Sequence, residues 1–284
     1  MLSVKDRRGI PSIMAFTSYA NLKKPEPDET VIRYTSLAQL VWIVTQQKLP
    51  LIRIDLFRDP YEGSAPTSSI NQQAIVLGGG YRRLQTIHIL KSWDPNDQVP
   101  VEPLQTTSAR QAELSATRRN RTYSTHASCW RWGAESEGMW RLYCGEREGV
   151  ALQTTFARLE KSVETEPIIA GKIQYADYED SATVFNEELD HVMYKREGFA
   201  FEQEVRLLKP DQDHHDKLCN GTVHEKLPDR LPIPWNIGAT IDRILVSPYA
   251  EDWYLEAVRA AARLAGEEVD GRVSWSRLRK PPDF

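Results

Sequence analysis

Short strand-like and helix-like runs follow one another in irregular order along this chain, and that order limits the folds open to it. VIRYTS at 31–36 is rich in β-branched and aromatic residues and predicts a strand. In the next run, apolar residues recur at i, i+3, i+4 and i+7 from Leu37, which predicts an amphipathic helix with Thr35 or Ser36 as its N-cap. Because strands and helices do not alternate regularly afterwards, the sequence predicts an α+β fold.

The remaining runs extend this mixed pattern. Further strands are predicted at 49–57, 125–132, 149–156, 170–177, 201–208 and 241–247, and helices at 138–144, 185–198 and 254–266. The Pro-rich, charged stretch KKPEPDE cannot hold a helix or a central strand, so it predicts an irregular N-terminal arm over 1–29. Residues 30–284 are then expected to form a single α+β catalytic domain, with a helical insertion at about 64–120.

Composition excludes several classes of protein. The chain has 284 residues, 40% of them hydrophobic, which is enough for a sizeable core. It lacks an apolar run near the roughly 20 residues that a membrane-spanning helix needs, and its first ten residues carry charges where a signal peptide is apolar. Cys129, Cys144 and Cys219 are widely spaced and odd in number, so neither a disulfide framework nor a cysteine zinc site is expected. Together these features predict a cytoplasmic protein.

Two carboxylates stand two residues apart in FEQEVRLL. On a strand, Glu202 and Glu204 point to the same face, and Arg206 continues that face. Neighbouring carboxylates repel each other, so one pKa rises or a cation neutralises the pair, and Arg206 is the candidate cation. Such a row on a core strand indicates the lining of a cleft. The structural alternative is an edge strand with a polar row facing solvent.

Two further segments carry candidate ligand-binding side chains. Arg33 and Tyr34 stand where the first strand meets a helix N-terminus, and Arg33 with the Thr35 hydroxyl is suited to an anion. In the strand 125–132, the Ser128 hydroxyl and Trp130 are suited to the floor of a pocket that stacks a planar ligand. The alternatives are a surface arginine and ordinary core tryptophans.

Positive charge is concentrated in one stretch, although the chain as a whole has a net charge of −4. Between Arg110 and Arg131 there are five arginines and one acidic residue. Arg118, Arg119 and Arg121 are therefore candidates for contacts with nucleic-acid phosphates. A solvated connecting segment is the alternative interpretation.

Metal and nucleophile motifs are weak. DQDHHD at 211–216 holds metal-ligand residue types but is expected to be a hydrated turn, and no metal is expected elsewhere. His191 is expected to be a core histidine. The cysteines are taken to lack a sequence-adjacent histidine that would activate them, and GGG at 78–80 lacks the spacing of a phosphate loop.

Three segments together resemble a bacterial family, domain of unknown function 2971. The segment 31–63 includes FRDPYE where that family has a phrase like F-N-D-P-F-E. The segment 127–155 is similar to its middle part, and FAFEQEVRLL resembles its Y-E-x-E-W-R. Arg58 in place of Asn and Val205 in place of Trp are departures from the family pattern.

The same segments resemble, in order, the ADP-ribosyltransferase pattern of the bacterial toxin and phage-defence type. Arg33, Ser128 and the pair Glu202-x-Glu204 match its strand arginine, strand serine and E-x-E. The resemblance implies a split β-sheet core with NAD⁺ in a cleft. Arg33 would contact the pyrophosphate or a ribose, assisted by Thr35, and Ser128 would support the nicotinamide pocket.

Within that resemblance, the remaining roles follow. Tyr34 or Trp130 would stack on the nicotinamide ring. Glu204 would be the catalytic carboxylate that stabilises the ribosyl cation, and Glu202 would orient or deprotonate the acceptor. The arginine-rich stretch 110–131 favours a nucleic-acid acceptor, RNA or DNA. The resemblance also implies an antitoxin or other regulatory protein partner.

Two other functions remain open from the sequence. The first is a defence-associated domain that binds a nucleotide or interacts with a partner without turnover. The second is a metal-dependent nuclease that would use four carboxylates, Asp59, Glu62, Glu202 and Glu204.

Overall fold

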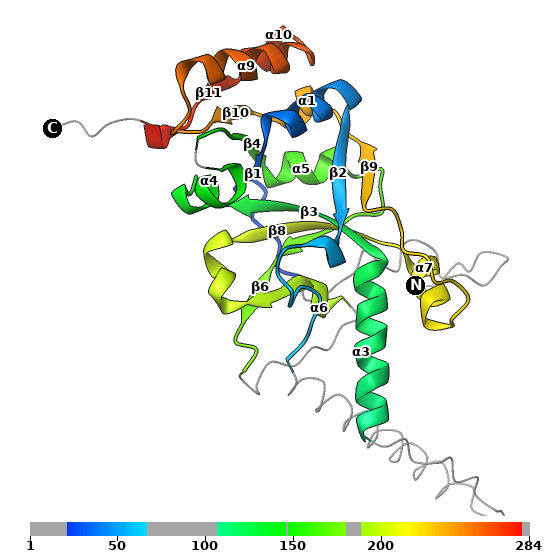
Figure 1. The fold of residues 1–284 in the computed structure, drawn as a ribbon. Coiled ribbons are helices and arrows are strands. Elements are labelled where there is room, and N and C mark those ends of the chain that lie inside the picture. The colour runs from blue at the N-terminus through cyan, green and yellow to red at the C-terminus, as the bar shows by residue number, and fades with distance from the viewer. Residues whose placement is uncertain (1–21, 67–106, 146, 180–188, 280–284) are drawn as a thin grey trace, which may run out of the picture.

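A nine-stranded mixed sheet forms the centre of the part of the chain that is described. The computed structural model describes residues 22–66, 107–145, 147–179 and 189–279. In the sheet, the strands run in the order β11-β10-β4-β1-β3-β2-β9, with β8 on β3 and β5 on β8 (Figure 1). Their bounds are β1 Thr30–Thr35, β2 Lys48–Arg53, β3 Thr125–Trp132, β4 Val150–Thr155, β5 Ile169–Lys172, β8 Glu204–Pro210, β9 Arg230–Pro234, β10 Arg243–Val246 and β11 Val273–Trp275. The α+β class predicted from the sequence is confirmed.

A second sheet and short helices surround the first. The strands β6 Gln174–Ala176 and β7 Tyr194–Arg196 pair in parallel to form the second sheet. The α-helices are α1 Leu37–Gln46, α3 Thr107–Tyr123, α4 Glu137–Cys144, α5 Phe156–Ser162, α6 Asp190–Met193, α7 Gln212–Cys219, α8 Ile237–Thr240, α9 Asp252–Arg263 and α10 Glu267–Asp270, and the 3₁₀ helices are η2 Ile54–Leu56, η3 Glu197–Glu202 and η4 Arg277–Arg279. None of the helices in the described ranges is long and apolar enough to cross a bilayer.

The central sheet divides along one edge of β3. The other edge of β3 pairs with β8 continuously, from Thr125 to Arg131. On the divided edge, β2 pairs with His126 and Ala127, whereas β1 pairs only with Arg131 and Trp132. The stretch of β3 around Ser128 to Trp130 is where these two strands separate. We call this place the fork.

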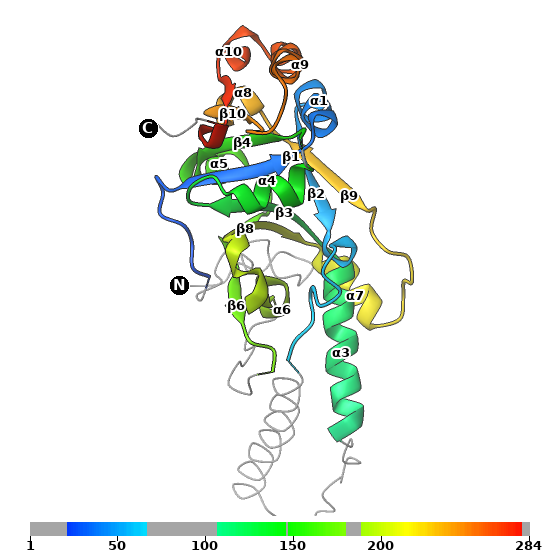
Figure 2. The ribbon, with the colours of Figure 1, turned by 60° about the vertical axis from the view of Figure 1, so that its left-hand side comes forward.

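Helices cover both faces of the sheet. The largest apolar cluster joins α1, α5, α8 and α9 to one face, through residues such as Leu40, Phe156 and Val258 (Figures 1 and 2). We call this the first face. On the second face, Trp140 of α4 packs near β1 and β4, and Val192 of α6 packs near β3 and β8.

Most of the predicted elements are present with shifted ends. The first strand and helix lie where predicted, and the Ser36 hydroxyl caps the helix by accepting from the Gln39 N–H at 3.2 Å. The strand predicted at 49–57 ends at Arg53 and continues as η2. Residues 170–177 form parts of two strands in different sheets rather than one. The helix predicted to end near Gly198 ends at Met193, and its first turn lies outside the described residues.

Three elements differ more strongly from prediction. The segment 211–216 is not a turn: Asp211 caps α7, its side chain accepting from the His214 N–H at 2.9 Å. The end of the insertion at 64–120 belongs to the long helix α3, while 67–106 lie outside the described residues. The edge strand β9 was missed because it contains Pro232 and Pro234, which only an edge strand tolerates.

Gly63 allows α3 to lie close to the turn that follows η2. Its φ is +72°, and a Cβ atom there would collide with the Thr122 hydroxyl. We expect Gly63→Ala to lower the free energy of unfolding by about 1–3 kcal/mol, because it adds both backbone strain and a clash. Gly198 has an ordinary φ and open space around its Cβ position, so Gly198→Ala is the matched control and should change stability by less than about 0.5 kcal/mol. Urea unfolding of both variants is the measurement, and equal stabilities would contradict this account of the turn.

Candidate functional site

A buried ionic cluster lies on the second face at the start of β8. Arg206 donates to Glu204 through Nε at 2.5 Å and through Nη2 at 3.3 Å, and its Nη1 pairs with Glu62 at 2.5 Å. The Lys195 ammonium joins the two carboxylates of the E-x-E pair, at 2.5 Å from Glu202 and 3.3 Å from Glu204. Arg206 is therefore the partner of Glu204, as predicted, but not of Glu202; the cation that joins the pair is Lys195, which sequence reasoning missed.

The local backbone differs from the predicted strand at Glu202. This residue ends η3, Gln203 adopts a left-handed conformation with φ +44°, and β8 begins only at Glu204. The two carboxylates nevertheless converge, because both contact the Lys195 ammonium. Glu204 is therefore held by the sheet, whereas Glu202 is held by the 3₁₀ helix that precedes it.

The cations control the ionisation of the cluster. Burial alone raises the pKa of Glu204, but Arg206 and Lys195 outweigh it and lower that pKa to about 2. For Glu62 the balance is reversed, because burial raises its pKa more than the Arg206 cation lowers it. Burial lowers the pKa of Lys195, and the two glutamates more than reverse this, so its pKa is raised. Glu204 and Lys195 thus stay charged at neutral pH.

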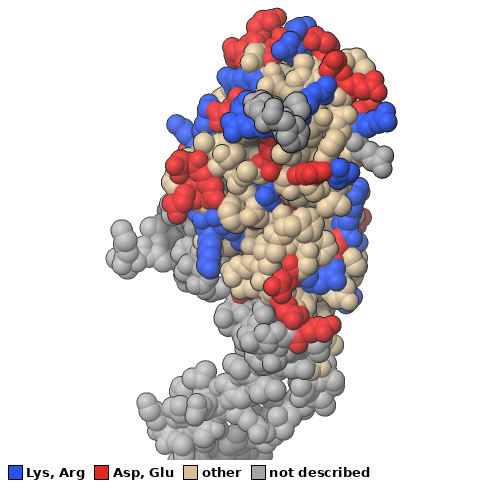
Figure 3. Space-filling model, turned by 90° about the vertical axis from the view of Figure 1, so that its left-hand side faces the viewer, with Lys and Arg blue, Asp and Glu red and all other residues tan. Residues whose placement is uncertain are grey.

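Glu202 connects the buried cluster to a side chain at the surface. Its second oxygen accepts a hydrogen bond from the Tyr143 hydroxyl at 2.6 Å, and Tyr143 is half exposed. Leu142 and Phe201 are exposed as well. The face of the molecule that carries α4 and η3 is mainly uncharged at its centre, with charged side chains toward its rim (Figure 3). Burial and the Glu202 carboxylate both raise the pKa of Tyr143, so this phenol remains a hydrogen-bond donor.

Arg33, Ser128 and Trp130 come together at the fork. Arg33 is only 7% exposed, and its Nη1 donates to the Ser128 hydroxyl at 2.5 Å. The Trp130 Nε1 donates to the same hydroxyl at 3.0 Å. Within the described ranges Arg33 has no ion pair, and its Nε has no hydrogen-bond partner. The strong desolvation lowers the pKa of this guanidinium.

The remaining predicted cofactor residues flank this group. Thr35 is buried, and its hydroxyl donates to the Gln39 side chain. Tyr34 points to the second face, where its ring contacts Trp140 edge-on at 5.0 Å and its hydroxyl accepts from the Ser136 N–H at 2.9 Å. Burial raises the pKa of Tyr34 to about 12.

The predicted site residues do not share one face of the sheet. Arg131 lies opposite Glu204 and Ser128 opposite Leu207, so Ser128 and Glu204 point to opposite sides. Arg33 and Trp130 lie on the first face with Ser128. The residues of the single cleft implied by the resemblance are therefore divided into two groups, one on each face of the sheet.

The three arginines of α3 that were predicted to contact phosphates occupy different environments. Arg119 is exposed and Arg118 is partly buried. Arg121 is fully buried, and its Nη2 donates to the Gln212 side chain at 2.7 Å. This position takes Arg121 off the surface where it was expected to contact phosphates, because its guanidinium ties α3 to α7.

The histidines and cysteines require one correction. His215 stands four residues before Cys219 on α7, and its Nε2 lies 3.6 Å from the Cys219 sulfur, so one cysteine does have a histidine one helical turn away. Burial lowers the pKa of His215 to about 4 and that of His191 to about 3. His191 is buried, as predicted for a core histidine. Across the described segments, three or more potential metal ligands do not converge at any point.

The comparisons with known proteins identify one part of the chain. No curated protein and no solved structure matches the chain. The matched region begins in α4 and ends in β8, so it includes Tyr143, Lys195, Glu202 and Arg206 of the ionic cluster. Residues 139–207 match the family model described as Protein of unknown function (DUF2971).

Proposed function

We propose that this chain transfers ADP-ribose from NAD⁺ to an acceptor, with the dinucleotide bound at the fork of the sheet. The observation that carries the proposal is Arg33, a buried guanidinium whose partner within the described residues is a serine hydroxyl and not a carboxylate. A buried charge without a counter-ion costs several kcal/mol. An anionic ligand, such as the pyrophosphate of NAD⁺, would supply that counter-ion.

The positions of the strands support the same ligand. Arg33 stands on β1 and Glu204 on β8, and these strands flank β3 on its two edges. Strands two positions apart in a sheet are separated by about 10 Å, a distance that a dinucleotide spans. A sheet with arginine, serine and the second glutamate of E-x-E on three adjacent strands is also in keeping with the arrangement that the resemblance implies. In this proposal, Ser128 and Trp130 hold Arg33 in place from the first face.

The carboxylates take different roles from those first expected. Glu204 is enclosed by Arg206 and Lys195, which leaves little of its charge for a substrate cation. Glu202 shares Lys195 with it, has no arginine partner among the residues described, and contacts the half-exposed Tyr143. We therefore assign the contact with the ribosyl centre to Glu202, and make Glu204 the residue that positions Lys195 and, through it, Glu202.

The proposed reaction follows from this arrangement. The bond between the ribosyl C1′ and the nicotinamide nitrogen breaks, its electron pair stays on nitrogen, and neutral nicotinamide leaves. The Glu202 carboxylate stabilises the positive charge that develops at C1′. The acceptor oxygen or nitrogen then bonds to C1′, and its proton passes to Glu202 or to water.

The proposed acceptor is nucleic acid. Arg118 and Arg119 lie on α3, in the lining of a pocket that the segment 55–65 also borders. Their guanidinium groups are suited to contacts with phosphates. A toxin or phage-defence role with a regulatory protein partner completes the proposal, and it rests on the resemblance alone.

Arg33→Met separates the proposed role from a structural one. Removing a buried charge that lacks a counter-ion should leave the free energy of unfolding unchanged or raise it by up to about 2 kcal/mol. The same change should weaken NAD⁺ binding at least about tenfold, because the pyrophosphate loses its cation. Calorimetric titration with NAD⁺ and urea unfolding measure the two effects. A variant that loses stability and keeps its NAD⁺ affinity would show that Arg33 is structural.

The alternative functions are ranked by the same contacts. A domain that binds nucleotides without turnover is second, because a pocket between α3 and the turn after η2 is lined by basic and aromatic residues. The nuclease is third. Each of its four carboxylates pairs with arginine or lysine, which leaves fewer oxygen atoms free for a metal ion.

A further inference from the structure

A pocket of about 460 Å³ lies between α3 and the segment 55–65, apart from the fork. Small-molecule sites usually measure about 300–1,000 Å³, so its size suits a metabolite. One side of α3 supplies Ser115, Arg118, Arg119 and Thr122, which recur at helical spacing. The lining residues on the other sides that matter here are Asp55, Phe57, Asp59, Glu62, Tyr123 and Lys226.

Each acidic side chain of the pocket is paired with an arginine. Asp55 pairs with the Arg53 Nε at 2.5 Å. Asp59 pairs with the Arg196 Nη2 at 2.7 Å. Glu62 pairs with the Arg206 Nη1 at 2.5 Å, as described for the ionic cluster, where Arg206 also holds Glu204. All three arginines come from outside the pocket lining, so they reduce the negative charge that these carboxylates present to the pocket.

The basic side chains of the lining differ from one another in their contacts. Arg119 is exposed and has no ion pair among the residues described. The Lys226 ammonium lies 3.2 Å from Asp55 and 4.1 Å from the centre of the Tyr123 ring. Arg118 stands beside Arg119 on the same wall. Arg119 is therefore the cation of this lining that an anionic ligand reaches from solvent, with Arg118 next to it.

Aromatic and hydroxyl groups accompany the cations. Phe57 and Tyr123 line the pocket, and Ser64, Ser115 and Thr122 add hydroxyl groups. Arginine forks suit phosphate oxygens, aromatic rings suit the faces of nucleobases, and hydroxyls suit a sugar. We propose that this pocket binds a nucleoside monophosphate unit, with its phosphate at Arg118 and Arg119 and its base beside Phe57 or Tyr123.

This inference goes beyond the proposed transferase activity and does not depend on it. The unit could be a free nucleotide or the phosphorylated end of a nucleic-acid strand, since both present the same groups. Arg33 takes no part in this pocket. Arg33→Met therefore should not change nucleotide binding here, and the two proposals can fail separately.

The test is calorimetric titration of the full chain with separate probes: AMP, GMP, CMP and UMP, inorganic phosphate, the four nucleosides, and a short oligonucleotide with a 5′-phosphate. We expect at least one nucleotide or the oligonucleotide to bind at least about tenfold more tightly than phosphate or any nucleoside. Arg119→Glu should weaken that binding at least about tenfold, by placing a negative charge against the phosphate. Arg147→Glu is the matched control, because this arginine is 75% exposed and lies outside the pocket lining. The nucleotide affinity of this variant should stay within about twofold of that of the unchanged protein.

A second variant tests the contact with the base. Tyr123→Leu should weaken nucleotide binding while leaving the affinity for inorganic phosphate unchanged. Equal affinities for phosphate and nucleotides would overturn the nucleoside part of the inference. Absence of binding by every nucleotide and by the oligonucleotide, or binding that Arg119→Glu does not affect, would overturn the site itself.

Discussion

Replacing Arg206 with methionine is expected to lower the free energy of unfolding by about 3–5 kcal/mol. Arg206 is completely buried and holds two buried carboxylates, Glu62 and Glu204, while its Nη1 also donates to the Val192 carbonyl at 2.7 Å. Methionine fills much of the space but leaves both carboxylates without their shared cation. The protein must then bury uncompensated negative charge, or protonate a carboxylate at a cost in free energy.

Urea unfolding at neutral pH measures this loss, and its pH dependence identifies the cause. Glu204 has a folded-state pKa below its unfolded value, so its contribution to stability is present above pH 4.5 and is lost as pH falls toward 2. Without Arg206 that pKa should rise, and this part of the stability should disappear. Arg141→Met is the control: its pair with Glu137 is exposed, so the change should leave the free energy of unfolding nearly unchanged. Equal losses in the two variants would contradict the central role given to Arg206.

Replacing Glu202 with glutamine is expected to reduce transfer from NAD⁺ at least about 100-fold, with the fold intact. The change is isosteric and removes one charge, while Tyr143 keeps a carbonyl oxygen to donate to and Lys195 keeps Glu204. The lost charge is the one that this proposal places beside the ribosyl cation. Turnover should fall and NAD⁺ affinity should change little, since Arg33 still binds the pyrophosphate.

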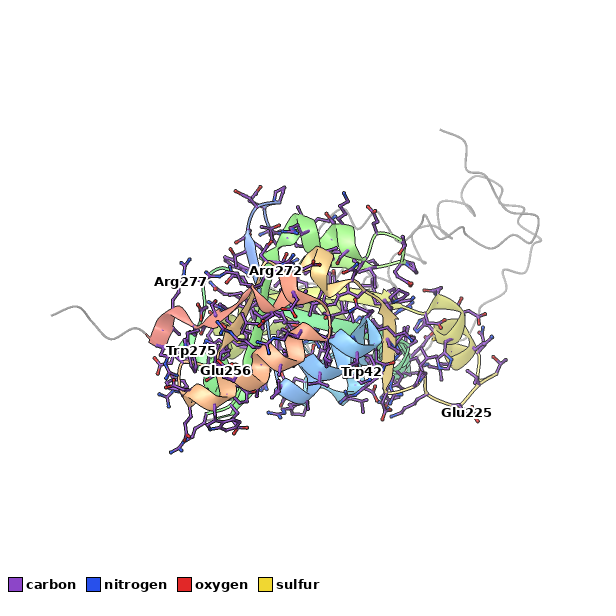
Figure 4. All side chains as sticks on the ribbon, turned by 90° about the horizontal axis from the view of Figure 1, so that it is seen from above. Trp42, Glu225, Glu256, Arg272, Trp275 and Arg277 are labelled. Atoms are coloured by element: carbon purple, nitrogen blue, oxygen red, sulfur yellow. The ribbon has the colours of Figure 1, made fainter. Side chains whose placement is uncertain are left out.

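Nicotinamide release is the assay, with thermal unfolding to check the fold. Glu256→Gln is the matched control, because Glu256 is an exposed carboxylate on α9 in the helical layer over the first face (Figure 4). Glu204→Gln should abolish transfer too, but it also breaks the buried cluster, so loss of activity there is less informative. Full activity in a folded Glu202→Gln variant would remove Glu202 from the reaction.

The sequence predicts this fold best where the information is local. The helix after the first strand has a serine cap and an apolar stripe, and both are present as expected. Spacing within one segment likewise predicts that Arg206 meets Glu204. The same local reasoning misplaces the segment 211–216, where the capping role of Asp211 was overlooked among residues that resemble a turn.

The candidate site depends on contacts that no single segment reveals. Glu62 reaches Arg206 from a turn far away in the sequence, although it belongs to a phrase already singled out. Lys195 was missed because nothing in its own segment connects it with the E-x-E pair. The faces of the sheet to which Ser128 and Glu204 point depend on the register of β3 against β8. A shift of one residue in that register would place the two side chains on the same face. Sequence patterns contain little information on register, so a single cleft was expected where the structure has two groups.

The most direct test of the proposed activity is incubation of the purified protein with NAD⁺ that carries separate labels in its adenylate and nicotinamide parts. Total cell extract supplies the acceptor, with nuclease or protease added to parallel samples. The proposal predicts release of nicotinamide and an equal amount of adenylate label in a fraction that nuclease removes. Label only in protein would contradict the nucleic-acid acceptor, and the absence of both label transfer and nicotinamide release would contradict the transferase itself.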